Sequence, residues 1–138
     1  MVVSLLYVAV QVRQNTRSVR AATYQAFSEA YCDFRTLLVK EERLGILWDK
    51  GLHSRSELST SERFQFDGLM MNWTRTAELH FYQEIKGLVD EPFYSGWLDE
   101  AAVVWRMPGA REWWSEHSRS FNADFRAVWE RRITSART

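Results

Sequence analysis

Residues 1–40 read MVVSLLYVAVQVRQNTRSVRAATYQAFSEAYCDFRTLLVK, and this stretch decides how the chain is organised. It contains neither glycine nor proline, the two residues that most often end a helix. The stretch therefore predicts one continuous helix over residues 2–40. Such a helix would be roughly 57 Å long at about 1.5 Å per residue. Because that length exceeds one face of a 138-residue chain, part of the helix is expected to project from the remainder.

The first twelve residues of this stretch are mostly apolar, and arginines follow them at positions 13, 17 and 20. An apolar run that meets positive charge is typical of a membrane helix at the lipid–water interface. A full span needs about 20 predominantly apolar residues. Residues 1–14 are therefore predicted to be the C-terminal half of a membrane-anchor helix, and residues 15–138 a single all-helical domain. The anchor helix makes the lipid bilayer a predicted partner. The arginines after it predict, by the positive-inside tendency, an inner (cytoplasmic) membrane location with the domain on the cytoplasmic side.

The side chains expected to contact a membrane or another protein come from this run, its basic flank and one aromatic pair. The pair is included because adjacent helical positions point roughly 100° apart, so at least one of its rings should lie at an exposed edge. The candidate membrane or interface residues are Val2, Leu5, Leu6, Val8, Val12, Arg13, Arg17, Trp113 and Trp114.

The remaining sequence predicts five shorter helices and shows no alternating apolar–polar pattern of the kind that forms strands. Ser59 and Glu62 have the spacing of a capping box, in which each side chain bonds the other residue's backbone N–H. Gly51 and Gly87 are expected to close the helices before them. The predicted helices cover about 41–50, 60–86, 91–105, 110–117 and 123–133. The fold class is all-α, a long N-terminal helix with a compact bundle of about five further helices, some short.

Hydrophobic periodicity predicts which helix faces lie in the core. On the first helix, the apolar residues that recur every three or four positions after Arg13 are Val19, Ala22, Ala26, Ala30, Phe34 and Leu37. On the helix over 60–86, the corresponding residues are Phe66, Met70, Trp73 and Ala77, followed by His80 or Phe81. Cys32 lies among apolar neighbours and is predicted to be a buried, inert thiol.

The composition excludes several classes of function. The chain carries 18 basic and 18 acidic residues, so it lacks the basic surface of a nucleic-acid binder, and no nucleic acid is predicted as a partner. Cys32 is the only cysteine, the three histidines lack the Glu-x-x-His spacing of helical metal sites, and the six glycines are scattered singly. We therefore predict no disulfide, no metal, no cofactor and no catalytic residues.

One group of polar residues is a candidate network or pocket. If the first helix packs antiparallel to the helix over 60–86, polar side chains of both would meet inside the bundle. Such a group would either fix the register of the two helices through hydrogen bonds or line a small ligand pocket. The candidate residues are Arg20, Tyr24, Gln25, Arg75, Glu78, His80 and Gln83.

Several segments together resemble an uncharacterised family of small bacterial helical proteins. They are Ser4–Val8, Gln11–Thr16 (QVRQNT), Arg20–Gln25, Phe81–Gln83, Gly87–Glu91, the spaced Trp97 and Trp105, and Arg111–Trp114. In that family a longer hydrophobic N-terminal helix leads into the same Gln-x-Arg-x-Asn-Thr junction and then into a helical domain. The resemblance implies a membrane tether and an all-helical domain, and it implies no enzymatic activity.

Three hypotheses for function follow. The first is a non-enzymatic, membrane-tethered helical domain that binds a protein partner or acts as a scaffold. The second is a soluble homo-oligomer in which residues 2–12 form the interface. The third is a ligand-binding or enzymatic bundle whose polar pocket lies between the first helix and the helix over 60–86.

Overall fold

The computed structural model describes residues 2–89 and 91–135, with side chains for all of these except 2, 3, 91–95 and 135. Within these residues the chain forms helices and no strand, which confirms the all-α class. The elements are α1 (Val2–Lys40), α2 (Glu42–Ser54), η1 (Arg55–Glu57), α3 (Thr60–Ile85), α4 (Glu91–Arg106), α5 (Pro108–His117), η2 (Ser118–Ser120) and α6 (Ala123–Ser135), where η denotes a short 3-10 helix. The side chain of Val2, one of the predicted interface residues, lies outside the described part.

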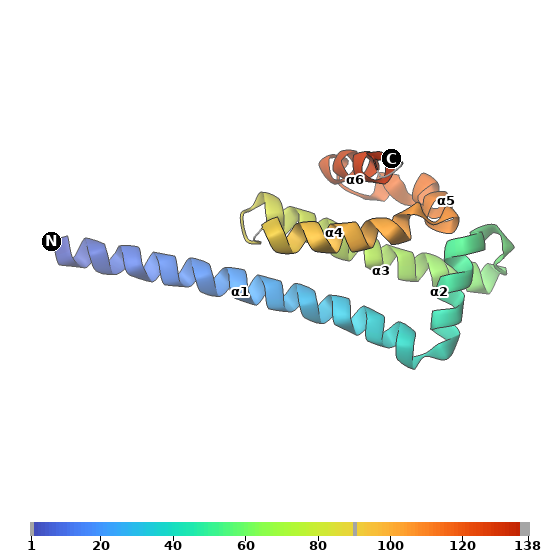
Figure 1. The fold of residues 1–138 in the computed structure, drawn as a ribbon, viewed down its shortest axis with the longest axis horizontal. Coiled ribbons are helices and arrows are strands. Elements are labelled where there is room, and N and C mark those ends of the chain that lie inside the picture. The colour runs from blue at the N-terminus through green and yellow to red at the C-terminus, as the bar shows by residue number, and fades with distance from the viewer. Residues whose placement is uncertain (1, 90, 136–138) are drawn as a thin grey trace.

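Figure 1 shows how these helices are arranged. α2 crosses steeply between the end of α1 and the start of α3, so α3 returns antiparallel to α1, and α4 then runs back beside α3. α5 and α6 cover this layer on the side away from α1. The N-terminal half of α1 extends past the end of α3 without a neighbouring helix (Figure 1).

The face of α1 that packs on the bundle is aromatic and differs from the predicted stripe. Phe27, Tyr31 and Phe34 are partly buried against the core, and Phe34 lies 5.3 Å from both Trp48 and Trp73 between ring centroids. Of the predicted stripe only Phe34 belongs to this face. The other members are exposed: Val19, Ala22, Ala26, Ala30 and Leu37. The prediction was wrong because large rings bury more apolar area than alanines, so the aromatic face of the helix turned inward.

The core is built from α3 and from the aromatic residues of α4, α5 and α6. The predicted α3 stripe is confirmed, since Phe66, Met70, Trp73 and Ala77 are all buried. His80 and Phe81 are both buried as well, although the sequence left open which of them faces inward. Around them pack the indole rings of Trp97, Trp105, Trp113 and Trp129, each less than a tenth exposed.

Two of the predicted helix ends are confirmed by their hydrogen bonds. At the start of α3 the Ser59 N–H donates to Glu62 Oε2 at 2.8 Å, and the Glu62 N–H donates to Ser59 Oγ at 3.3 Å, which is the capping box. At its end Gly87 has a φ of 67°, a backbone conformation that side-chain-bearing residues rarely adopt. The N–H groups of Gly87 and Leu88 then donate to the carbonyls of Glu84 and Gln83.

Gly51 does not close α2, which continues to Ser54. Instead Gly51 and Gly109 are buried where α2 crosses α5. A β-carbon at Gly109 would overlap the Gly51 carbonyl oxygen, and a β-carbon at Gly51 would overlap the Phe66 ring. The glycine that we read as a helix terminator therefore permits two helices to approach closely.

The predicted membrane anchor and inner-membrane location are not supported, and both are corrected here. None of the helices described, α1 included, has a stretch that is both long enough and apolar enough to cross a bilayer. The apolar run of α1 is soon followed by Gln14 and Asn15, and Arg13, Arg17 and Arg20 place a charge on each of the next turns. A continuous helix of 39 residues is therefore apolar over less than the length of a span.

Candidate functional site

The projecting part of α1, residues 4–19, presents apolar side chains to solvent on every side. Leu5 is 70% exposed, Leu6 63% and Val12 60%, and Tyr7, Val8 and Val10 are each more than half exposed. Arg13 and Arg17 are exposed on the same segment. A contiguous apolar surface of this kind on a folded chain marks a site of interaction.

The candidate polar residues of α1 point to separate partners. Arg20 Nε donates to the Gly87 carbonyl at 3.1 Å, which ties α1 to the turn after α3. Gln25 Nε2 donates to Glu29 Oε1 at 2.8 Å on α1 itself. Tyr24 is nearly half exposed.

Arg75 and Glu78 on α3 face α6. Arg75 donates to Glu78 Oε2 at 2.6 Å and to the Ser120 carbonyl at 3.0 Å, and its guanidinium lies 4.4 Å from the centre of the Phe121 ring. Glu78 Oε1 accepts the Asn122 N–H at 2.6 Å, just before α6 begins. An open cleft of about 510 Å³ lies beside this pair. The two residues attach the start of α6 to α3.

His80 faces the opposite side of α3, toward α1 and α4. Its ring centroid lies 3.8 Å from that of Phe27 and 5.5 Å from that of Trp97, and the residue is 2% exposed. Burial lowers the pKa of His80 from 6.5 to about 4, so the imidazole is neutral at pH 7. Gln83, one turn later, is partly buried.

The seven candidate polar residues therefore do not converge on one site, and those on α3 lie on two sides of that helix. Positions 78 and 80 of a helix point roughly 200° apart, so Glu78 and His80 cannot line one pocket between α1 and α3. The structure places Arg75 and Glu78 against α6, and His80 in the aromatic core. The pocket hypothesis loses its geometric basis.

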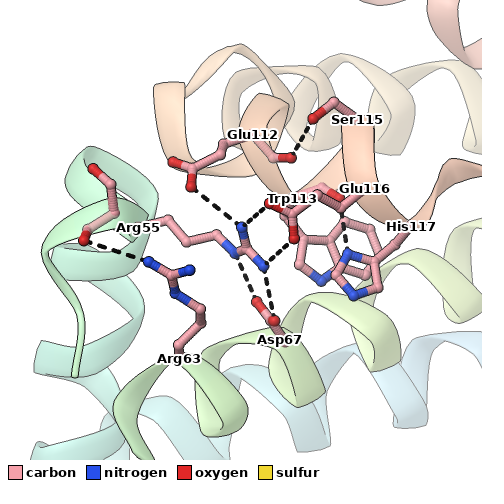
Figure 2. Close-up of polar contacts among 9 residues, drawn as sticks. Arg55, Arg63, Asp67, Glu112, Trp113, Ser115, Glu116 and His117 are labelled. Atoms are coloured by element: carbon pink, nitrogen blue, oxygen red, sulfur yellow. Dashed lines mark hydrogen bonds and ion pairs between the residues drawn. The ribbon is translucent and has the colours of Figure 1, made fainter. Parts of the chain in front are cut away.

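A different charged cluster, not predicted from the sequence, joins η1, α3 and α5 (Figure 2). Its centre is Arg55, which is 1% exposed. Arg55 Nε and Nη2 donate to the two oxygens of Asp67 at 2.8 and 2.9 Å. Nη1 and Nη2 donate to the two oxygens of Glu116 at 3.0 and 2.8 Å, and Nη1 also donates to Glu112 at 3.3 Å.

These five hydrogen bonds match the five N–H donors of a guanidinium, so the Arg55 cluster is saturated internally. The hydrogen bonds that Arg55 donates to Asp67, and to a smaller extent those to Glu116, raise the pKa of Arg55 above its ordinary value. Donation by Arg55 lowers the pKa of Glu116. With every donor engaged by carboxylates, the buried Arg55 guanidinium holds three elements together and has no donor left for a substrate.

One feature of the sequence could have indicated the Arg55 cluster. Glu112 and Glu116 lie four residues apart on α5, where like charges repel unless a cation lies between them. The cation comes from Arg55, more than fifty residues away. Sequence spacing alone does not name that partner.

The predicted exposed aromatic pair is buried. Trp113 is 0% exposed and Trp114 is 8% exposed, which corrects the expectation of an edge ring. Both rings pack against Trp105 and Phe121: the centroid distances are 5.9 and 6.1 Å for Trp113 and 5.1 and 5.5 Å for Trp114. Adjacent positions of one helix can both be buried when neighbours cover both faces.

Cys32 is exposed on α1, which also corrects a prediction. Its position is not on the aromatic face formed by Phe27, Tyr31 and Phe34, and the thiol therefore faces away from the core.

Comparisons of the chain with protein-family models, with curated proteins and with solved structures find no match. The resemblance to a bacterial helical family therefore stays a prediction. Among the features described above, the projecting part of α1 is the candidate functional surface, because its large apolar side chains are exposed and no helix of the bundle lies beside it.

Proposed function

We propose that this protein is a non-enzymatic helical assembly module that binds a second copy of itself through the projecting part of α1. The long N-terminal helix would be the binding element, and the bundle of α2 to α6 the body that carries it. The single observation that supports the proposal is the exposure of Leu5, Leu6, Val8 and Val12 on a helix that extends beyond its own bundle.

The physical reason is the hydrophobic effect. Apolar surface that leaves water contributes roughly 25 cal/mol per Å². Most of the stability of a helix in a protein comes from the packing of its apolar face, which the projecting part of α1 lacks within its own chain. Pairing with a second helix supplies that packing. The residues of the projecting part that are not apolar are polar or basic, which keeps the unpaired form soluble enough to meet its partner.

The test is sedimentation equilibrium of the purified chain at loading concentrations from micromolar to submillimolar. We expect a mass that rises toward twice the chain mass with concentration. The double variant Leu5→Glu, Val12→Glu should remain monomeric, because a pair would bring carboxylates into an apolar contact. Val39→Glu, a single apolar-to-glutamate change at an 82% exposed position on the same helix, is the control and should associate like the parent.

Two results would overturn the proposal. One is a monomer mass at every concentration. The other is a dimer that forms equally well in the Leu5→Glu, Val12→Glu variant. Circular dichroism of both variants, recorded at a concentration at which the parent is monomeric, should match the parent, since none of the three substituted side chains is part of the core.

A further inference from the structure

The exposed side of α1 carries a regular repeat that continues from the projecting part toward the bundle. Its residues alternate steps of three and four: Leu5, Val8, Val12, Asn15, Val19, Ala22 and Ala26. This is the spacing of the a and d positions of a coiled coil. All seven are exposed, with Val8 at 56% and Val19 at 41%. We call these residues the α1 seam.

The α1 seam and the bundle-facing side of α1 are distinct. At 100° per residue the seam is centred roughly a quarter-turn away from the face of Phe27, Tyr31 and Phe34. A helix laid along the seam would therefore not displace the bundle. Arg13 and Arg17 lie outside the seam, so two paired helices would not bury them.

We propose that two copies pair antiparallel along the α1 seam, with Asn15 opposite Asn15 of the partner subunit; this rests on the self-association proposed above. In this register Leu5 faces Ala26 of the partner subunit and Val12 faces Val19 of the partner subunit. Val8 lies near Ala22 of the partner subunit. Leu5 and Val8 each meet an alanine and Val12 meets a valine, so the helices keep a similar separation along the overlap.

The alternatives fit the seam less well. A parallel pair would place Leu5 against Leu5 at one end and Ala26 against Ala26 at the other, which forces the helices apart at one end only. A register in which Val12 faces Ala22 would place Asn15 against Val19, leaving a buried amide without a hydrogen-bond partner. Asn15 at the centre of an otherwise apolar seam thus selects one register, as single polar residues do in coiled coils.

The size of the contact predicts a reversible pair. An overlap of 22 residues is about 33 Å long. Two helices of about 10 Å diameter in contact over that length bury on the order of 1,000 Å² in total, near the lower limit for a specific interface. The unpaired monomer would then remain accessible at low concentration.

Orientation can be measured with the natural cysteine. Cys32 is the only cysteine, is exposed and lies outside the seam. With a nitroxide spin label on Cys32, the antiparallel pair places the two labelled positions 34 residues apart along the axis, about 50 Å. A parallel pair places them at the same height, roughly 20–30 Å apart. Pulsed electron–electron double resonance spectroscopy of the labelled full chain distinguishes these distances.

We expect one distance distribution near 50 Å at a concentration at which sedimentation shows dimers. A distribution at 20–30 Å in a dimeric sample overturns the antiparallel arrangement and leaves self-association intact. Absence of dipolar coupling together with a monomer mass overturns both proposals.

The role of Asn15 is tested separately. Asn15→Leu should tighten association by at least about tenfold and broaden the distance distribution, because an all-apolar seam no longer selects a register. Gln14→Leu is the matched control, one position away and off the seam, and should change neither quantity. An unchanged affinity and an unchanged distribution for Asn15→Leu would show that Asn15 does not lie in the interface.

Discussion

Gly109 at the start of α5 lies directly against the backbone of Gly51 in α2, so closely that a β-carbon on Gly109 would overlap the Gly51 carbonyl oxygen. The obstacle is backbone, which cannot rotate away as a side chain can. The approach of these two helices also brings Glu112 and Glu116 of α5 within reach of Arg55 in η1. The glycine pair and the Arg55 cluster are therefore parts of one contact between α2–η1 and α5.

Gly109→Ala should lower the free energy of unfolding by about 1–3 kcal/mol, since overpacking a close contact forces the helices apart. Gly68→Ala is the control. It lies in the interior of α3 with open space around its added methyl group, and it should be neutral or stabilising by up to about 1 kcal/mol. Urea unfolding followed by circular dichroism measures both. Equal effects of the two substitutions would contradict the close approach of α2 and α5.

Arg55→Lys should destabilise the fold by about 1–3 kcal/mol, because an ammonium with three donors cannot replace the two bidentate contacts of a guanidinium and leaves a buried cation with fewer hydrogen bonds. The control is Arg35→Lys. Arg35 pairs with Glu100 at 3.0 Å where both side chains are more than half exposed, and the change should cost much less stability than Arg55→Lys, because water screens an exposed ion pair. Chemical denaturation of the two variants gives the comparison. A loss no larger for Arg55 than for Arg35 would show that the Arg55 cluster does not stabilise the fold.

The stability of the parent should fall as the pH drops from about 6.5 to about 4. In this window the unfolded chain protonates His80, whose ordinary pKa is 6.5, while burial holds its folded pKa at about 4. Because the unfolded state then binds more protons, unfolding is favoured by up to about 1.4 kcal/mol per pH unit.

His80→Phe, which keeps an aromatic ring in contact with Phe27 and Trp97, should flatten that part of the pH curve. His53→Gln, at an exposed position, is the control and should retain the slope of the parent. Thermal unfolding at a series of pH values between 4 and 7 supplies the curves. A slope in His80→Phe equal to that of the parent would contradict a neutral, buried His80.

Cys32 should react with a thiol reagent in the folded protein, because its side chain is exposed. We expect a rate within about tenfold of the rate for the urea-unfolded chain, since access and not unfolding limits the reaction. The absorbance of the chromophore that Cys32 releases from an aromatic disulfide reagent, followed with time in buffer and in urea, gives the two reaction rates. A thiol that reacts only on unfolding would place Cys32 inside the core.

Local features of this chain were predictable, because each depends on residues that are near one another in sequence. The capping box of Ser59 and Glu62 formed at the predicted position, and Gly87 ended α3. The α3 stripe from Phe66 to Ala77 also faced inward as periodicity required. In each case the prediction needed only a local backbone geometry or a spacing of three or four residues along the chain.

Three of the wrong predictions concern competition between surfaces. On α1 two apolar stripes were available, one of alanines and valines and one containing Phe27, Tyr31 and Phe34, and the periodicity did not rank them. Trp113 and Trp114 were expected to have one exposed ring because the number of covering helices was unknown. The candidate polar residues were grouped by proximity in sequence, although Glu78 and His80 point to opposite sides of α3.

By itself, the sequence determined that the chain is helical throughout its described length, where α3 begins and ends, and that α1 carries an apolar run with a basic flank. Only the tertiary structure decided that Arg55 pairs with Asp67, Glu112 and Glu116, that Gly51 and Gly109 meet, and which side of α1 remains exposed. The physical reason is that helix formation depends on neighbours three or four residues away. Burial and charge pairing depend on which distant surfaces gain most by leaving water together.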